Sequence, residues 1–250
     1  MSGVPKPFQM TVNGLMTEIF YPQQTMDTVF LPLLRRWTAL WEQKKRRVIV
    51  YLAAPPGVGK TTTALFLEQL SRQTAGVHPV QAIGLDGFHY HQEYILSHTV
   101  WDGEREVPMR DIKGCPETFD IEKLHRKLVA LQTQDVKWPI YDRTLHDVVE
   151  DSLHVTGDIV LLEGNWLLLD EGRWAALTAY CDDTVFIEAQ ADLLEERLIR
   201  RKIQGGLCPA DARAFYERSD RKNVERVLGG HKKANICLRM EEDGSYTMLP

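Results

Sequence analysis

The sequence predicts an α/β fold with a doubly wound, mostly parallel sheet and flanking helices. Its apolar runs are continuous rather than alternating, as at Val48–Ala53 and Ile159–Leu162, which is typical of strands buried on both faces. Stretches with helical periodicity separate these runs, for example residues 60–73. A chain of 250 residues, 44% of them hydrophobic, is also long and apolar enough to build such a core.

The N-terminal segment predicts a hairpin followed by a helix. Residues 8–21 alternate around Asn13-Gly14, a pair that favours tight hairpin turns. Pro32 is expected to start or kink the helix, because proline lacks the N–H that a helix interior needs. The apolar face of this helix consists of residues at helical spacing, namely Leu33, Leu34, Trp37, Leu40 and Trp41.

Strands and helices are expected in turn along the rest of the chain. Val80–Leu85 and Thr184–Ile187 predict two more buried strands. Helices are expected at residues 120–131, 191–203 and 209–228. The long irregular segment 87–118 is of a kind that is usually functional.

A second hairpin is expected around Asp243-Gly244. No linker or repeat divides the sequence, so we expect one domain. It would comprise a hairpin and helix extension (1–46), a core with a lid near 197–223 (47–230), and the terminal hairpin (231–250).

The most specific motif follows the first apolar run. It reads Ala54-Pro55-Pro56-Gly57-Val58-Gly59-Lys60-Thr61, continues with Thr62, and has the Walker A spacing with alanine where glycine is more usual. Backbone N–H groups after the prolines can form a nest around a phosphate, at the positive end of the following helix. Residues 54–62 are therefore the predicted ATP site, in which Lys60 bridges the β- and γ-phosphates and the Thr61 hydroxyl binds Mg²⁺.

Two carboxylates are expected at the same edge of the sheet. Asp86 follows the strand that begins at Val80, and Glu163 follows the strand that begins at Ile159. Ligands of open parallel sheets bind beyond the carboxyl ends of the strands. One carboxylate can hold Mg²⁺ and the other can accept the proton of an acceptor hydroxyl. The alternative is a turn or cap role, since Asp-Gly is a common turn pair.

Three arginines are candidates for stabilising the charge of a transferring phosphoryl group. Arg197, Arg200 and Arg201 occur together, and Arg197 shares a helix face with Arg200 or Arg201. The alternative is a solvated face on which these arginines pair with Glu195 and Glu196.

These motifs resemble the phosphoribulokinase, uridine kinase and pantothenate kinase group of P-loop kinases, over residues 48–228. Within that group the sequence is most similar to the branch labelled YggC-like or fructose-transport-associated. The segments that carry the resemblance are Asp86–His89, Lys113–Asp120, Pro139–Asp142 with His146, and Glu163–Asp170. The resemblance implies that Asp86 is the base, that Glu163 lies on the Mg²⁺ side, and that the arginines belong to a mobile lid. It also implies that Asp220 and Asn223 lie near the active site.

The lid departs from the uridine kinase pattern, so a nucleoside substrate does not carry over. Candidate acceptor-binding residues are His89, Lys113, Tyr141, Asp142, Arg143, His146, Asn165 and Asn223. Residues 141–146 either recognise the acceptor or form a surface turn. Lys113 either holds an acidic group or belongs to a solvated loop.

The expected function is an ATP- and Mg²⁺-dependent kinase that phosphorylates a hydroxyl of a small metabolite. Sugars, nucleosides and pantothenate-like alcohols all remain open, and the alternatives are another P-loop NTPase or a nucleotide-binding regulator. A net charge of −5 disfavours a nucleic-acid partner. Four cysteines without a Cys-x-x-Cys pair and no apolar signal core favour a cytoplasmic protein with no membrane partner. The oligomeric state is left open.

Overall fold

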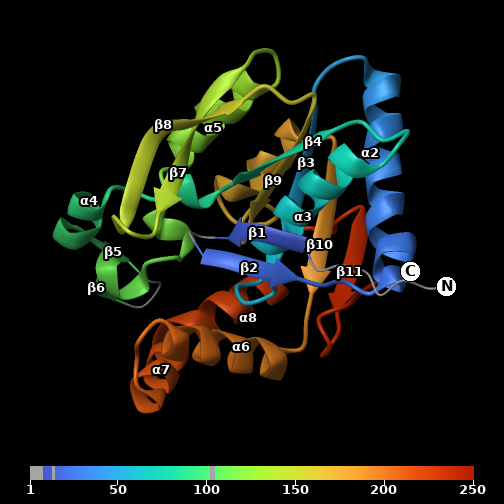
Figure 1. The fold of residues 1–250 in the computed structure, drawn as a ribbon. Helices are drawn as coiled ribbons and strands as arrows, with labels where there is room; N and C mark the ends of the chain where they lie inside the picture. The colour runs from blue at the N-terminus through green and yellow to red at the C-terminus, as the bar shows by residue number, and fades with distance from the viewer. Residues whose placement is uncertain (1–7, 13–14, 102–104) are drawn as a thin grey trace.

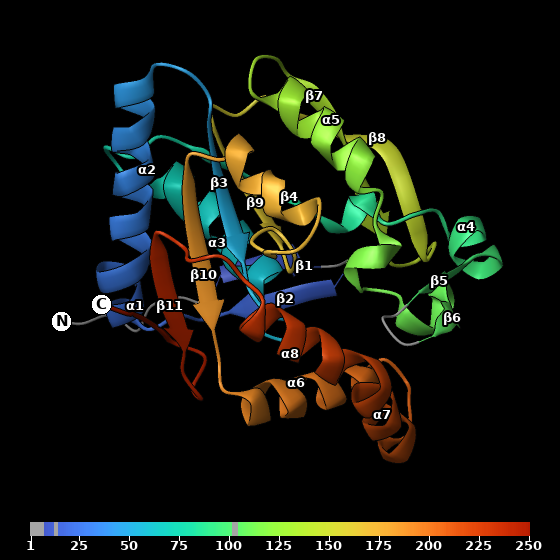
Figure 2. The same cartoon turned by 180° about the vertical axis from the view of Figure 1, so that it is seen from behind.

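The computed structural model describes residues 8–12, 15–101 and 105–250. Its centre is a sheet in the order β12-β11-β10-β3-β9-β4, with helices on both faces (Figures 1 and 2). The strands are β3 (Val48–Ala53), β4 (Val80–Gly84), β9 (Ile159–Gly164), β10 (Asp183–Glu188), β11 (Ile236–Met240) and β12 (Tyr246–Met248). Strands β4, β9, β3, β10 and β11 are parallel, whereas β12 pairs antiparallel with β11. The predicted mostly parallel α/β fold is confirmed.

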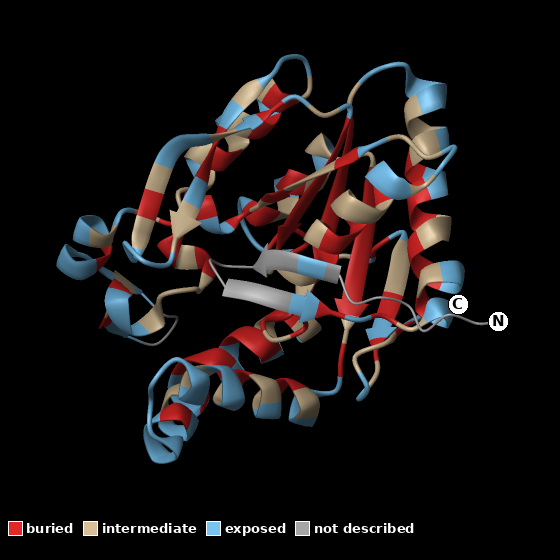
Figure 3. Ribbon diagram, viewed as in Figure 1, coloured by how far each residue is buried: buried red, intermediate tan, exposed pale blue. Residues whose placement is uncertain are grey.

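The central strands are buried on both faces, as their continuous apolar runs predict (Figure 3). Successive side chains of a strand point to opposite faces, so Val50 and Leu52 join one core while Ile49 and Tyr51 join the other. The first core lies under α2 (Leu31–Lys44) and α3 (Lys60–Gln73). The second lies under α5 (Ile121–Leu131) and a 3₁₀ segment, Trp174–Tyr180.

The N-terminal hairpin and helix both form. Strands β1 (Phe8–Val12) and β2 (Leu15–Ile19) pair antiparallel, whereas the turn residues Asn13-Gly14 lie outside the described residues. Helix α1 (Gln23–Thr25) and a π turn, Met26–Phe30, lead into α2, and Pro32 is its second residue. The break in helical geometry thus falls just before proline, where a missing N–H disturbs the ladder least. The expected apolar face is buried, with Leu40 and Trp41 at its edge.

The segment after β4 is built from short elements. These are a 3₁₀ turn (Asp86–Phe88), α4 (Gln92–Ser97), the paired strands β5 (Thr99–Trp101) and β6 (Glu106–Pro108), and two further 3₁₀ turns, Met109–Ile112 and Pro116–Thr118. Their short lengths explain why no clear periodicity marks them in the sequence.

The prediction also missed the hairpin of β7 (Val136–Asp142) and β8 (Asp147–Val155). The sequence there reads as a polar run with a surface turn, because Pro139 interrupts the alternation and the pairing register shifts between Trp138 and Ile140. Trp138 and Val155 nevertheless bury one face of the hairpin.

The last helices lie beyond the carboxyl ends of the parallel strands (Figures 1 and 2). They are α6 (Ala191–Gln204), α7 (Pro209–Phe215) and α8 (Arg221–Gly229). The predicted helix 209–228 is interrupted by a π turn at Tyr216–Asp220. Within the described ranges, no helix is long and apolar enough to cross a bilayer.

Candidate functional site

The glycine-rich turn between β3 and α3 adopts a conformation suited to anion binding. Gly57 and Gly59 have φ values of +91° and +93°, a region that residues with a Cβ rarely adopt. A Cβ on Gly57 would also lie 3.1 Å from the Leu198 Cγ atom of α6. The turn therefore needs glycine both for its backbone and for its contact with α6.

A hydroxyl and a carboxylate meet at the start of α3. Thr61 Oγ1 donates a hydrogen bond to Glu163 Oε1 at 2.8 Å, and Glu163 is only 7% exposed. Burial raises the pKa of Glu163 to about 7; nearby Lys60 opposes this shift and Asp86 adds to it. Burial also lowers the pKa of Lys60, against the effects of Glu163 and Asp86. The predicted metal pair and the P-loop lysine thus form one electrostatic unit.

A cavity of about 160 Å³ opens next to this unit. Its polar lining comes from Thr61, Asp86, Tyr141, Arg143 and Glu163. The apolar lining is contributed by α3, β4 and the β7–β8 hairpin, through Ala64, Leu65, Ala82, Ile83, Ile140 and Leu153. Asp86 is exposed at this cavity, so its carboxylate can reach a ligand there.

Lys113 ties the long segment to the hairpin. Its Nζ atom donates to the Gln92 side-chain oxygen, to Tyr141 Oη at 2.9 Å and, weakly, to the His146 carbonyl oxygen at 3.4 Å. All three partners are neutral, and among the described residues Lys113 forms no ion pair. Gln92 was missed because no sequence signal links it to residues 141–146; tertiary folding alone brings it there.

His89 is buried close to this contact between the long segment and the hairpin. Its ring stacks on Phe119 with centroids 3.8 Å apart, and its Nδ1 lies 3.2 Å from the Thr118 carbonyl oxygen. Burial lowers the pKa of His89, and the nearby Asp86 carboxylate partly opposes that shift. The lowered pKa favours the neutral imidazole, so His89 supports the neighbouring residues by packing and not by charge.

Asp142 was predicted to bind the acceptor, but its contacts are those of a turn residue. Its Oδ1 atom accepts hydrogen bonds from the backbone N–H groups of Thr144 and Leu145, at 2.7 and 3.0 Å. This is the local geometry with which aspartate closes a turn. Neighbouring Arg143 lines the cavity, so within this segment the cation and not the carboxylate faces the site.

The three arginines of α6 separate in space. Arg197 Nε donates to the Gly57 carbonyl oxygen at 2.8 Å, which places it against the glycine-rich turn. Arg201 is exposed to solvent, but it lies close enough to Asp220, Arg143 and Asp86 for their charges to act on its pKa, and two of these residues line the cavity.

Arg200 faces the other way. It lies 3.5 Å from Glu196 and lines an outer groove with Glu195 and Arg213. The structure therefore does not bring Arg200 to the site, and the solvated-face interpretation describes it better.

A second group of polar residues, Asn165, Asp220 and Asn223, lies where α8 meets the loop after β9. Asn223 Oδ1 accepts a hydrogen bond from the Cys115 thiol at 3.0 Å. Asn165 Oδ1 and Asp220 Oδ2 are buried without a hydrogen-bond partner in the described part of the chain. Buried polar atoms are normally paired, so these two oxygens are available to a ligand or water. Lys202, another residue that the prediction missed, lies close enough to oppose the burial that raises the pKa of Asp220.

The chain resembles known kinases over most of its length. A family model described as the phosphoribulokinase / uridine kinase family matches residues 49–221. The uncharacterised protein YggC of Escherichia coli K12 is 44% identical over 239 residues, which cover 95% of this chain and 97% of that protein. A pantothenate kinase of Enterococcus faecalis is 30% identical over 158 residues, covering 61% of this chain and 48% of the relative. The crystal structure of a candidate fructose transport system kinase from Silicibacter has a TM-score of 0.67 and 30% identity, covering 77% of this chain and 89% of that one.

Proposed function

Because the chain belongs to the phosphoribulokinase / uridine kinase family, we propose that it transfers the γ-phosphoryl group of ATP to a hydroxyl of a small metabolite. One observation carries the proposal: Asp86 and Glu163 line the same cavity as Thr61, the residue that follows the P-loop lysine. The proposed phosphate site, the proposed metal ligands and the proposed base would thereby share one opening, as phosphoryl transfer requires.

Residues 54–62 would hold the phosphates, with Lys60 as the cation among them. Thr61 and Glu163 would hold Mg²⁺, because a hydroxyl and a carboxylate are the hard oxygen donors that this ion prefers. Their fit is supported by the buried position of Glu163: burial raises its pKa to about 7 even with Lys60 nearby, so a bound cation would stabilise the charged carboxylate. When bound, the ion would neutralise charge on the phosphate oxygens.

Asp86 would accept the proton of the acceptor hydroxyl. Its side chain is exposed at the cavity, and in the described residues it takes part in no ion pair. Arg201 and Arg143 would stabilise the charge of the transferring group, while α6 to α8 would exclude water. Positioning and charge neutralisation supply most of the catalysis in such reactions, so a carboxylate base suffices.

The acceptor side of the cleft favours an acceptor that carries an anionic group. Lys113 is held by neutral oxygens, and Arg143 lines the cavity. Within the described ranges neither forms an ion pair, whereas Arg200, on the outer face, has Glu196. A phosphorylated sugar or a pantothenate-like carboxylate would supply the missing charge.

The test is an ADP-release assay with acceptors in matched pairs, each with and without its phosphate or carboxylate. We expect acceptor-dependent ADP release, with kcat/KM higher for the anionic member of the productive pair. Release that no acceptor stimulates would favour a different P-loop NTPase, and nucleotide binding without release would favour a regulator. Equal rates for both members of the productive pair would refute the preference for an anionic acceptor, but the proposed kinase activity would stand.

A further inference from the structure

Three buried hydroxyls form a chain behind the P-loop. Tyr21 Oη lies 3.1 Å from Thr63 Oγ1, which in turn lies 3.0 Å from Tyr246 Oη. These residues come from the segment after β2, from α3 and from β12, yet all three are at least 93% buried. Tyr21 and Tyr246 lie outside the family match at residues 49–221.

The series of three hydroxyls ends at the backbone of the glycine-rich turn. Tyr246 Oη donates to the Val58 carbonyl oxygen at 3.4 Å. Thr63 donates its backbone N–H to the next carbonyl oxygen, that of Gly59, at 3.0 Å, which leaves its hydroxyl proton for Tyr246 Oη. Arg197 Nε holds the preceding carbonyl oxygen, that of Gly57, at 2.8 Å. Three consecutive carbonyl groups are therefore held, those of Gly57 and Val58 by side chains from α6 and β12 and that of Gly59 by the first backbone hydrogen bond of α3.

The planarity of the peptide bond converts these contacts into a direction for the N–H groups. In a trans peptide the N–H of one residue points opposite to the carbonyl group of the residue before it. Holding the carbonyls of residues 57, 58 and 59 therefore turns the N–H groups of residues 58, 59 and 60 the other way. An anion nest forms where such N–H groups converge on one point.

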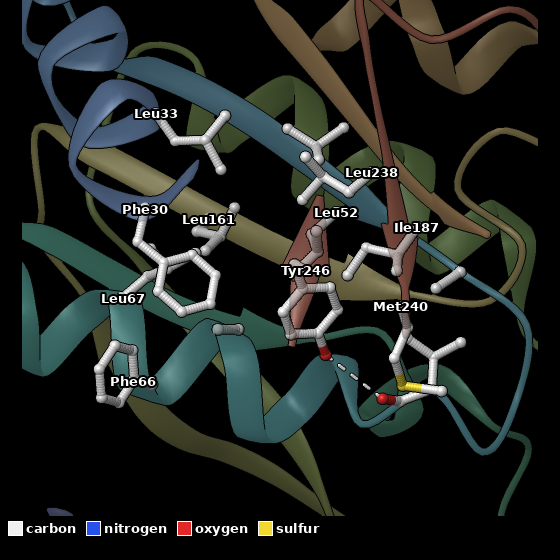
Figure 4. Packing of buried hydrophobic residues seen from close by; sticks show 14 of the residues in the cluster. Phe30, Leu33, Leu52, Phe66, Leu67, Leu161, Ile187, Leu238, Met240 and Tyr246 are labelled. Carbon is white, nitrogen blue, oxygen red and sulfur yellow. Dashed lines mark hydrogen bonds between the residues drawn. The ribbon is translucent and has the colours of Figure 1, made fainter. Parts of the chain in front are cut away.

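The aromatic rings fix the position of these hydroxyls. Tyr21 packs edge-on against Phe30 and Phe66, with centroids 4.8 and 4.7 Å apart, and Tyr246 lies 5.8 Å from Phe30. Figure 4 shows Tyr246 within this cluster, with a hydrogen bond leaving its hydroxyl. Burial raises the pKa of Tyr21 and of Tyr246, so both hydroxyls keep their protons and can donate.

We propose that Tyr246 and Thr63, supported by Tyr21, are positioning residues that keep the P-loop amides directed at the nucleotide phosphates. Tyr21 and Tyr246, which lie near opposite ends of the sequence, thereby take part in nucleotide binding, although neither of these two residues lines the cavity beside Glu163. The inference rests on the proposed nucleotide role of the turn.

The test compares Tyr246→Phe with Tyr51→Phe. Both substitutions remove a buried tyrosine hydroxyl that donates to a backbone carbonyl, but Tyr51 contacts Leu177, on the other face of the sheet. For Tyr246→Phe we expect the Kd of MgATP to rise about three- to tenfold, the size of one hydrogen bond. The KM of the acceptor should stay unchanged, and Tyr51→Phe should leave both constants at the wild-type value.

Hydrogen exchange of the nucleotide-free protein gives a readout that does not need activity. Amides of residues 57–62 should exchange faster in Tyr246→Phe and in the isosteric Thr63→Val, but not in Tyr51→Phe. Unchanged exchange and unchanged Kd in both variants would overturn the proposal, as would equal effects of Tyr51→Phe. If the wild-type protein bound no nucleotide, the proposed function would fail, and the exchange data would still decide whether these hydroxyls hold the turn.

Discussion

The individual carboxyl groups around the cleft differ in their burial and in the hydrogen bonds that they already accept. Glu163 is buried and accepts a hydrogen bond from Thr61, whereas Asp142 is engaged by its own turn. Asp86 is exposed at the cavity. A base must be able to approach its substrate, so the exposed carboxylate fits the base role and the buried one fits the metal role.

Asp86→Asn should abolish transfer while leaving ATP binding intact, because the amide keeps the shape of the side chain but cannot take a proton. We expect kcat to fall by about 10²- to 10⁴-fold, the usual contribution of a general base. Lys60→Ala should lower kcat and raise the Kd of ATP. ADP-release kinetics and nucleotide titration measure the two effects, and near-normal turnover of Asp86→Asn would remove Asp86 from the base role.

His89 should make stability depend on pH. Burial lowers its pKa from the ordinary value of 6.5, so below about pH 6.5 the unfolded chain binds more protons than the folded one. The free energy of unfolding should therefore fall as the pH falls from 6.5 through the folded pKa. His89→Asn should flatten this slope in urea unfolding between pH 5 and 7, whereas the exposed His98→Asn should not. A slope that His89→Asn leaves unchanged would contradict this reading.

Among the elements, the β7–β8 hairpin depends on one close backbone contact. A Cβ on Gly87 would lie 2.0 Å from the Pro139 carbonyl oxygen, so only glycine lets the turn after Asp86 meet β7. Trp138 strengthens the contact, because its Nε1 atom donates to the Gly84 carbonyl oxygen at 2.8 Å and its ring packs on Phe88. This contact sets the distance between Asp86 and the hairpin residues Tyr141 and Arg143, which line the same cavity.

Gly87→Ala should displace the hairpin and impair acceptor binding more than nucleotide binding. We expect a loss of about 1–3 kcal/mol in stability from overpacking, together with a higher KM for the acceptor. Gly229→Ala is the matched control, since nothing lies within 4 Å of a Cβ at that position. Thermal unfolding and steady-state kinetics measure the two effects. An acceptor KM equal to the wild-type value would show that this contact does not position the hairpin.

At the scale of the whole molecule, Asp183 joins three segments that are distant in the sequence. Its fully buried carboxylate accepts two hydrogen bonds from Arg36, at 2.8 and 3.0 Å, and one from Trp37 Nε1 at 3.1 Å. Asn235 Nδ2 donates a further one at 2.8 Å. The N-terminal helix, the central sheet and the approach to the C-terminal hairpin are thereby connected at one buried charge.

Asp183→Ala should destabilise the fold by about 3–5 kcal/mol, because removing one partner leaves buried donors unpaired. Glu188→Gln disrupts the more exposed pair with Arg239 and should cost about 1 kcal/mol or less. Urea unfolding of the two variants measures the difference. Similar losses in both would show that Asp183 does not connect the segments as strongly as its contacts indicate.

Several elements could be predicted from the sequence. They are the P-loop, the buried strands, and the helices from Lys60 to Gln73 and from Ala191 to Gln204. The reason is that each is encoded by neighbouring residues, through glycine spacing, apolar runs and helical periodicity. The positions of Asp86 and Glu163 followed as well, because strand ends meet at one edge of a parallel sheet.

Other features depended on contacts between residues far apart in the chain. Arg200 and Arg201 are equivalent in sequence, and only the packing of α6 turns one outward and the other toward Asp220. The sequence by itself therefore determined that a phosphate-binding turn faces two carboxylates. The tertiary structure decided which cations reach them and that Tyr246 lies behind the turn, because such proximities arise from packing and leave no local pattern.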